Sequence, residues 1–469
     1  MDHHENEEQN KPHPLPIKPL DARFMFLGTA SMSPSSTRNV SGNALQIGKE
    51  WTIIDCGEGT QHQILKAKCI SPAKINRIFI THLHGDHCFG LPGLLCMINN
   101  AVTDTEEDKI VHLIGPRGLR NMTRAALLSS GTATMFRFRI DELWNNNDNS
   151  IILKQKNSDH KHLTSNKLRH YSQVFEIPQH PSELPGLNIE PNGKDGASAT
   201  WVLPPHPGGG NVSTDWTLYA GPLVHTIASV GYVFQEHFHR GKIDTSSTLK
   251  ERILSTENRS YQKKENGIKN PLQLLGELQQ GRSIQIQECS KIVEIKPEDY
   301  MTPPTPGRKI AVLGDTCDSR AIASLVANAN LLVHESTNYA NIEEGEEPET
   351  VLQMAVLRGH STPAMSGTFA KCCAVKLLLL THFSSRYKGD ESKESLAVMD
   401  QIVKEAQDHL GHEHVIAARD FMEVPIPIKQ HHKGGGKEAG ACITPVTSLD
   451  ATEKASAAAD SFLHRAGLS

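Results

Sequence analysis

A short His-rich turn, HLHGDH at residues 82–87, constrains this chain more than any other feature of its sequence. It follows a compact β-like run at residues 76–81 and precedes an apolar stretch at residues 91–98 that suits a helix. Imidazole nitrogens and carboxylate oxygens are ligands that bind zinc at about 2.0 to 2.2 Å. The turn therefore predicts a metal site at the end of a strand, with a chance grouping of surface histidines as the alternative.

The turn can serve two ions. Residues in alternate positions leave a strand end on the same side, so His82 and His84 can bind one ion while Asp86 and His87 turn toward another. Completing both sites needs distant ligands that also follow apolar runs: His225, Asp315 and His382. Ligands at the ends of successive strands can converge on one edge of a sheet, whereas a single His in such a place is more often a surface residue.

The rest of the chain alternates short strand-like runs with helix-like segments, which is typical of an α/β protein. We expect strands at residues 24–27, 44–47, 51–54, 111–114, 310–313, 331–334 and 375–381. One large domain at residues 21–428 accommodates them. The polar, Pro-punctuated segment 1–20 and the small-residue segment 429–469 are expected to be disordered.

Two stretches interrupt this rhythm. Residues 145–210 begin with an Asn-rich sequence and end in prolines and glycines, which predicts an irregular surface insertion. Residues 235–282 are charged and carry few apolar side chains, so an ordinary solvated loop is one interpretation. Within that stretch, residues 240–269 hold eight Lys or Arg against four Asp or Glu.

Composition limits the partners and the compartment. A net charge of -5 gives no global basic field, so any contact with nucleic acid must be local. No apolar run approaches the roughly 20 residues needed to span a bilayer, so no membrane partner is expected. Nine cysteines without a CxxC pair suit a reducing compartment, and the acidic N-terminus is unlike a transit peptide, which favours cytoplasm or nucleus.

In order along the chain, HxHxDH, a later His, GDT at residues 314–316 and THFSSRY at residues 381–387 resemble the metallo-β-lactamase superfamily. The resemblance implies a four-layer αββα sandwich and two zinc ions. By it, one zinc is held by His82, His84 and His225, and the second by Asp86, His87 and His382. Asp315 is implied to be the carboxylate that bridges the two ions.

Four further motifs are similar to those of short-form tRNase Z: FLGT at 26–29, DCGEGTQ at 55–61, HEST at 334–337 and GHST at 359–362. The resemblance implies a zinc-dependent endoribonuclease that removes the 3′ trailer of precursor tRNA. Its products would be a 3′-hydroxyl on the tRNA and a 5′-phosphate on the trailer. It further implies that residues 235–282 form a flexible tRNA-binding arm, and that the protein is a homodimer.

The resemblance also implies roles for individual residues. Asp86 would orient the nucleophile, and His360, charged by Glu335, would protonate the leaving oxygen, although His360 could instead cap a helix at residues 361–373. Five basic or amide side chains are expected to contact RNA: Arg38, Asn39, Arg386, Lys263 and Lys264. The first three are equally plausible as structural hydrogen-bond donors.

Two other functions fit the metal turn, because the same scaffold supports several chemistries. One is the hydrolysis of a small-molecule ester or sulfate ester, with the arm as a lid. The other is a catalytically silent RNA-binding or scaffold protein, which the complete ligand set disfavours.

Overall fold

The computed structural model describes residues 21–103, 108–144, 176–192, 199–209, 215–239, 241–244, 248–427 and 445–467. These residues form two compact units, one made by Glu236–Gly307 and the other by the rest of the described chain. The predicted disordered segment 1–20 lies outside the described residues. No described helix combines the length and the apolar character that crossing a bilayer would require.

The larger unit contains two sheets. In the first, the strands run in the order β18-β1-β2-β3-β4-β5-β6-β7, and β8 also pairs with β6. Their bounds are β1 Ala22–Gly28, β2 Gly42–Ile47, β3 Glu50–Cys56, β4 Ile75–Phe79, β5 Ile110–Pro116, β6 Arg137–Leu143, β7 Glu183–Leu184, β8 Asn188–Ile189 and β18 Glu423–Pro425. The predicted strands at 24–27, 44–47, 51–54 and 111–114 lie within β1, β2, β3 and β5, which confirms them.

The second sheet has the order β17-β16-β15-β14-β11-β10-β9. Its strands are β9 Trp201–Val202, β10 Trp216–Leu223, β11 Ser229–Glu236, β14 Lys309–Leu313, β15 Leu331–Glu335, β16 Leu378–Thr381 and β17 Val415–Ala417. Strands β14, β15, β16 and β17 pair in parallel. Their carboxyl ends therefore meet at one edge, where polar residues from different parts of the chain can converge.

Strand β1 shows how the sequence builds layers. Phe24 and Phe26 pack between the sheets, while Met25 and Leu27 pack on the opposite face. Successive side chains of a strand point to opposite faces, so a strand that is apolar at every position is covered on both sides. Strands β3, β4 and β15 follow the same rule.

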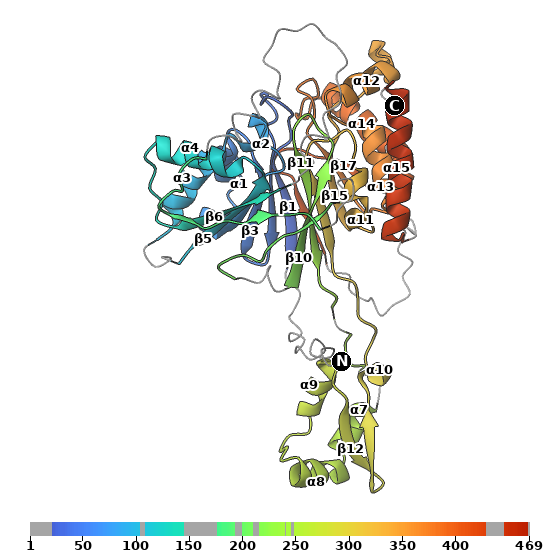
Figure 1. Ribbon diagram of the computed structural model, residues 1–469. Coiled ribbons are helices and arrows are strands. Elements are labelled where there is room, and N and C mark those ends of the chain that lie inside the picture. The colour runs from blue at the N-terminus through green and yellow to red at the C-terminus, as the bar shows by residue number, and fades with distance from the viewer. Residues whose placement is uncertain are drawn as a thin grey trace, which may run out of the picture. The chain divides into compact units, whose positions relative to one another are not determined.

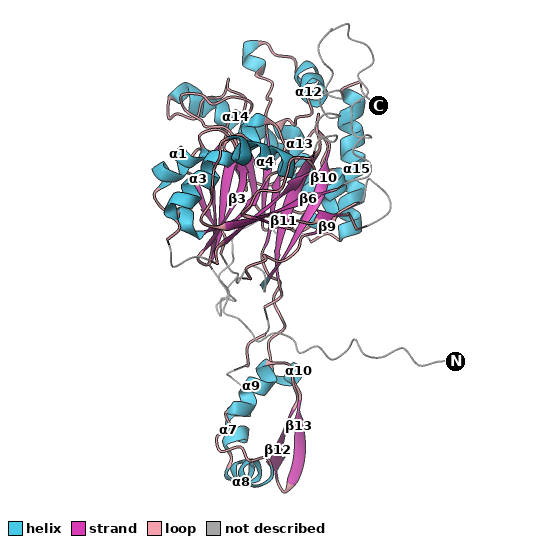
Figure 2. Cartoon of the chain, turned by 60° about the vertical axis from the view of Figure 1, so that its left-hand side comes forward, coloured by secondary structure: helices cyan, strands magenta, loops and turns pink. Residues whose placement is uncertain are grey.

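Helices cover the outer face of each sheet (Figures 1 and 2). The first sheet is covered by α1 Thr60–Ala67, α3 Leu91–Ala101 and α4 Leu119–Ser129. The second is covered by α11 Ala323–Val326, α13 Pro363–Cys372, α14 Lys393–Leu410 and α15 Ser448–Arg465. The predicted four-layer αββα sandwich is confirmed, and α3 and α13 contain or overlap the helices expected at 91–98 and 361–373.

The C-terminal segment differs from the prediction of disorder at 429–469, because Ser448–Arg465 forms helix α15. The helix starts at a capping box in which Thr447 and Asp450 each bond the other's backbone amide. Ala451 and Ala455 pack into the core outside the second sheet, and Phe462 packs against α12, Pro348–Leu357. Because the segment is of low complexity, the apolar face that its small residues form on the helix was not recognised from the sequence.

The described parts of the expected insertion at 145–210 carry strands β7, β8 and β9. Trp201 of β9 is buried between the sheets, so this part of the chain adds to the core. The remainder of the insertion lies outside the described residues.

The smaller unit, Glu236–Gly307, has a core of its own. Its elements are α7 Leu249–Leu254, α8 Thr256–Glu265, α9 Gln273–Gln279, α10 Pro297–Tyr300 and the hairpin β12 Ile284–Glu288 with β13 Lys291–Ile295. The side chains that fill it include Leu249, Ile253, Leu278 and Ile286. We call this unit the arm. It continues beyond the expected boundary at residue 282 because the hairpin supplies three of the seven buried apolar residues of its core, Ile284, Ile286 and Ile295.

Candidate metal centre

Strand ends place the predicted ligands. The HLHGDH turn follows β4 and leads into α2, Gly85–Cys88, which carries Asp86 and His87. His225 follows β10, Asp315 follows β14, and His382 follows β16. Four segments that lie up to 300 residues apart in the sequence therefore meet at one edge of the sandwich, as the sequence predicted.

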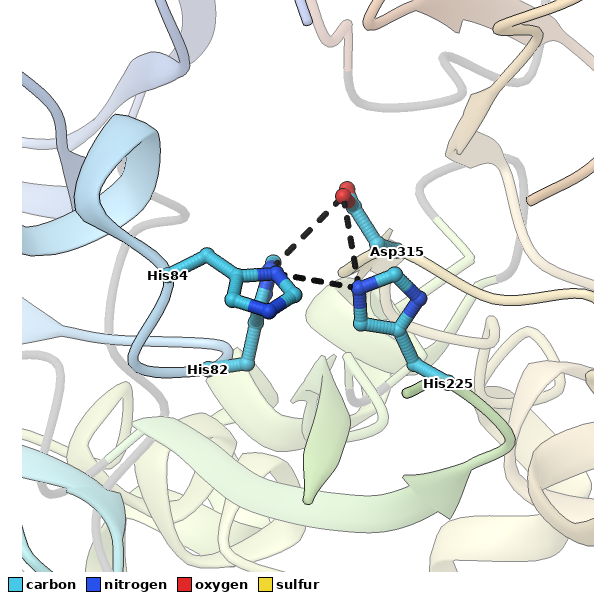
Figure 3. Close-up of side chains that lie close together, drawn as sticks. All are labelled: His82, His84, His225 and Asp315. Carbon is cyan, nitrogen blue, oxygen red and sulfur yellow. Dashed lines mark hydrogen bonds and ion pairs between the residues drawn. The ribbon is translucent and has the colours of Figure 1, made fainter. Parts of the chain in front are cut away.

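The first group brings together His82, His84, His225 and Asp315 (Figure 3), and its nitrogen ligand atoms are His82 Nε2, His84 Nδ1 and His225 Nε2. His84 Nδ1 lies 3.1 Å from each of the other two nitrogens. A tetrahedral zinc ion with nitrogens at about 2.0 Å would separate them by about 3.3 Å. The three imidazoles thus already have the spacing of zinc ligands.

The second group comprises Asp86, His87 and His382. The Nε2 atoms of the two histidines lie 3.1 Å apart, and Asp86 Oδ2 lies 3.6 Å from that of His87 and 3.5 Å from that of His382. This set of two imidazoles and one carboxylate also suits zinc.

Asp315 lies between the two groups. Its Oδ2 is 3.6 Å from His82 Nε2 and 3.3 Å from His382 Nε2, while its Oδ1 is 3.4 Å from His87 Nε2. A carboxylate that faces ligands of both groups is placed to join two ions.

In four of the five histidines, Nδ1 contacts a hydrogen-bond partner on the side away from the ligand groups. The Nδ1 of His87 donates to Asp55 at 2.7 Å and that of His225 donates to the carbonyl of Gly359 at 2.7 Å. The Nδ1 atoms of His82 and His382 contact the hydroxyls of Thr81 and Thr337 at 3.1 and 2.9 Å. Such partners fix the tautomer that leaves Nε2 free for a metal.

Asp55 and Glu335 anchor these contacts in the two sheets. Thr81 donates its hydroxyl to Asp55, and Thr337 donates its own to Glu335, so each carboxylate supports a histidine through a threonine. Asp55 also binds His87 directly, and Glu335 also accepts from His360 Nδ1 at 3.2 Å. Sequence reasoning left Asp55, Thr81, Thr337 and Gly359 out of the site, although all four adjoin the quoted motifs.

Gly359 shows why one of those motifs needs glycine. Its φ of 77° lies in the left-handed region, and a Cβ there would lie 2.6 Å from His225 Nδ1. Any other side chain would displace the histidine that its carbonyl orients.

Burial and neighbouring charges shift the pKa values of the histidines of the site in different directions. Burial lowers the pKa of His82 well below its usual value and lowers that of His225 to about 4, which favours the neutral, ligating form. Burial also opposes the charge of His360, yet the charge and hydrogen bond of Glu335 outweigh it and raise the pKa of His360 to about 9. His360 is therefore protonated at neutral pH.

The five expected RNA contacts fall in different environments. Arg38 is 2% exposed and donates to Thr29 and to the carbonyls of Tyr387 and Ala418. Its expected RNA contact is corrected to a structural role, because the guanidinium joins the loop to the C-terminal half of the domain. Asn39 is half-buried, and its side chain donates to the carbonyl of Glu58.

The other three cations are exposed. Arg386 pairs with Glu346 near the end of the THFSSRY motif. Lys263 and Lys264 lie on α8 of the arm. These three side chains are open to solvent and can reach a ligand from outside.

Comparisons with known proteins agree with the fold and the site. The family model described as anti-Pycsar protein Apyc1 matches residues 22–171, less than half of the chain. The chain is 31% identical to human zinc phosphodiesterase ELAC protein 1 over 86% of its length and 98% of the relative's. It is 30% identical to ribonuclease Z of Streptococcus sanguinis over 86% of its length and all of the relative's.

A solved structure gives the same picture. The crystal structure of human tRNase Z, short form, matches with a TM-score of 0.51 and 25% identity, covering 87% of this chain and all of that one. The sandwich with its His and Asp clusters thus defines a metal-dependent hydrolase of the metallo-β-lactamase fold. Within that class, the chain belongs to the ribonuclease Z family.

Proposed function

We propose that this protein is a zinc-dependent endoribonuclease that removes the 3′ trailer of precursor tRNA and leaves a 3′-hydroxyl on the tRNA and a 5′-phosphate on the trailer. The observation that carries the proposal is the meeting of seven ligand side chains, from residue 82 to residue 382, in two groups joined by Asp315. The choice of RNA as substrate and of zinc as metal is supported by relatives named ribonuclease Z and zinc phosphodiesterase, which the chain matches over almost their whole length.

Two zinc ions would be held in each subunit. His82, His84 and His225 would hold one, Asp86, His87 and His382 the other, and Asp315 would contact both. Such a pair supplies a nucleophilic hydroxide at neutral pH and neutralises charge on the phosphoryl oxygens.

Asp86 is placed to orient the attacking oxygen. Its Oδ2 accepts the backbone N–H of Met32 at 2.7 Å, which fixes the carboxylate in the site. A fixed carboxylate can hold a nucleophile in line with the scissile phosphorus and accept its proton.

His360 would protonate the leaving 3′ oxygen. Its Nδ1 faces Glu335 at 3.2 Å, and Nδ1 is also 3.7 Å from Asp315, so the imidazolium stands at the edge of the metal groups. The remaining ring nitrogen, Nε2, can carry the donated proton. Glu335 also accepts hydrogen bonds from the backbone N–H groups of Thr316 and Ser361, which hold the carboxylate in place.

The arm would bind the tRNA through contacts to its phosphates. Lys263 and Lys264 are exposed on α8, where phosphate contacts add affinity without reading sequence. Across Glu236–Gly307, eleven Lys or Arg face ten Asp or Glu, so the basic excess is confined to residues 240–269. Asn39 and Arg386 would contact the RNA near the metal centre.

We also propose a homodimer in the cytoplasm or nucleus. The free cysteines of the described chain, buried ones such as Cys56 and Cys373 among them, suit a reducing compartment. Light scattering of the purified protein would test the dimer.

The test of the function is cleavage of a defined, 3′-extended precursor tRNA by zinc-loaded protein. We expect one cut after the discriminator base, abolished by chelation and restored by zinc. Hydrolysis of an aryl sulfate without any cut in the RNA would refute the proposal.

A further inference from the structure

Two large apolar side chains project into solvent beside the metal centre. Phe89 is 70% exposed and Met32 is 78% exposed. Burying a phenylalanine side chain stabilises a folded protein, so leaving one in water forgoes stability. Each residue is nevertheless fixed to the HLHGDH turn.

The ring of Phe89 lies directly on the metal turn. Its backbone N–H bonds the carbonyl of Gly85 at 2.9 Å, and a Cβ built on Gly85 would lie 2.5 to 3.1 Å from three atoms of the ring. Gly85 stands between two ligands, His84 and Asp86. A Cβ at this position would push the ring away from the backbone that carries the ligands.

Met32 reaches the same turn from another part of the chain. Its backbone N–H donates to Asp86, and its φ of 61° is in the left-handed region, which is uncommon for a long side chain. The neighbouring Ser31 N–H bonds the carbonyl of Phe383, next to His382. The loop is thus tied to two ligand segments while the Met32 side chain stays in solvent, and strain of this kind concentrates at functional sites.

We infer that Phe89, with Met32 held on the same turn through Asp86, forms a stacking platform for the nucleobase that flanks the scissile phosphate. This inference rests on the proposed function. An RNA backbone that brings a phosphate to the metal ligands must place the attached base within one nucleotide of them. A π-face is the surface that an unpaired base of any identity can stack on, at about 1 to 3 kcal/mol per base.

A platform of this kind would let the enzyme accept precursors with different bases at the cut. Stacking is tolerant of sequence, whereas hydrogen bonds to base edges are selective. The platform positions the substrate and takes no part in the chemistry.

The first test compares Phe89→Ala, Phe89→Leu and Phe89→Trp. For precursor tRNA, we expect Ala and Leu to raise KM by about 5- to 150-fold, the range that loss of one stacked base predicts, and Trp to stay near wild type. Hydrolysis of methyl p-nitrophenyl phosphate, which has no base, should remain within about twofold in all three. Leu65→Ala removes a side chain with 64% exposure on α1 and is the matched control, expected to change neither substrate.

The second test is a double-mutant cycle with the substrate. Precursors that carry an abasic site immediately 5′ or immediately 3′ of the cut are compared with the intact precursor. With the wild type, one of the two abasic sites should raise KM as much as Phe89→Ala raises it on the intact precursor. With Phe89→Ala, the same abasic site should raise KM no further. Additive losses at both positions, or equal KM values for Phe89→Leu and wild type, would overturn the platform.

The outcomes separate the platform from the proposed function. If the wild type does not cut precursor tRNA, the function fails; if it cuts and the cycle shows no coupling, only the platform fails. A loss of the dimer in Phe89→Ala, measured by light scattering, would make this surface a subunit contact and would also overturn the inference.

Discussion

The metal centre and the arm are built in opposite ways: the centre joins distant parts of the chain, whereas the arm is formed by one continuous segment. Ligands from positions 82 to 382 converge in the centre, where five of the seven are buried and each histidine Nδ1 that faces away from the ligand groups has a fixed partner. The arm is a local unit, Glu236–Gly307, with a small core and exposed Lys263 and Lys264. Chemistry needs groups fixed to within a fraction of an ångström, whereas contacts to phosphates tolerate mobile side chains.

The comparison predicts that damage to the centre affects every substrate and damage to the arm affects only tRNA. The largest effect is expected for Asp86→Ala, which removes a proposed metal ligand and the group proposed to orient the nucleophile. We expect a loss of at least about 10³-fold in kcat on both precursor tRNA and methyl p-nitrophenyl phosphate. Asp408→Ala, an exposed change on α14, is the control; trailer release by Asp86→Ala at the wild-type rate would contradict the mechanism.

His360→Ala should separate the substrates inside the centre. We expect a loss of about 10² to 10⁴-fold on precursor tRNA, whose leaving 3′ oxygen needs a proton. A p-nitrophenolate leaving group does not, so the loss on methyl p-nitrophenyl phosphate should be below about tenfold. His464→Ala, exposed on α15, controls for loss of an imidazole.

The pH profile adds a check on the same residue. Because the pKa of His360 is raised to about 9, the active protonated form is present below that pH and is lost as the pH rises through it. The rate on precursor tRNA should fall above about pH 9 in the wild type. A fall of the same size in His360→Ala would show that another group titrates.

Asp55→Asn should have an intermediate effect. The substitution keeps the shape but weakens the support of His87 directly and of His82 through Thr81. We expect a loss of about 10- to 100-fold in zinc affinity, measured by competition with a chelator, with activity regained at high zinc. Unchanged affinity would mean that the ligands hold their orientation without this carboxylate.

The smallest effect is expected in the arm. Lys263→Glu with Lys264→Glu should raise KM for precursor tRNA by about tenfold at low salt and flatten the salt dependence of binding. Hydrolysis of methyl p-nitrophenyl phosphate should not change. Lys404→Glu on α14 is the control, and equal losses on both substrates would break the distinction between arm and centre.

The centre could be predicted from the sequence because its ligands obey a simple rule. A polar residue directly after an apolar run marks a strand end, and the ends of parallel strands share an edge. That rule holds for Asp315 after β14 and His382 after β16. Asp55 and Gly359 also adjoin strand ends or loops of quoted motifs, but their roles depend on which imidazole nitrogen faces them, and sequence carries no signal for that.

Two expectations, one from the family resemblance and one from composition, differ from the structure because neither source carries information on tertiary packing. Arg38 was expected to contact RNA, yet its guanidinium is buried. A guanidinium can be buried when carbonyl groups accept hydrogen bonds from its N–H groups, as the carbonyls of Tyr387 and Ala418 do here. The small-residue tail was expected to be disordered, yet alanines spaced along α15 fit closely against α11 and α13. Both outcomes are set by tertiary contacts that no local pattern reveals.

The most direct measurement is the mapping of both product ends after zinc-loaded protein cuts a 3′-extended precursor tRNA. We expect a tRNA that ends in a 3′-hydroxyl at the discriminator base and a trailer that begins with a 5′-phosphate. A zinc-loaded protein that leaves the precursor intact, or that leaves a 3′-phosphate, would contradict the proposed function.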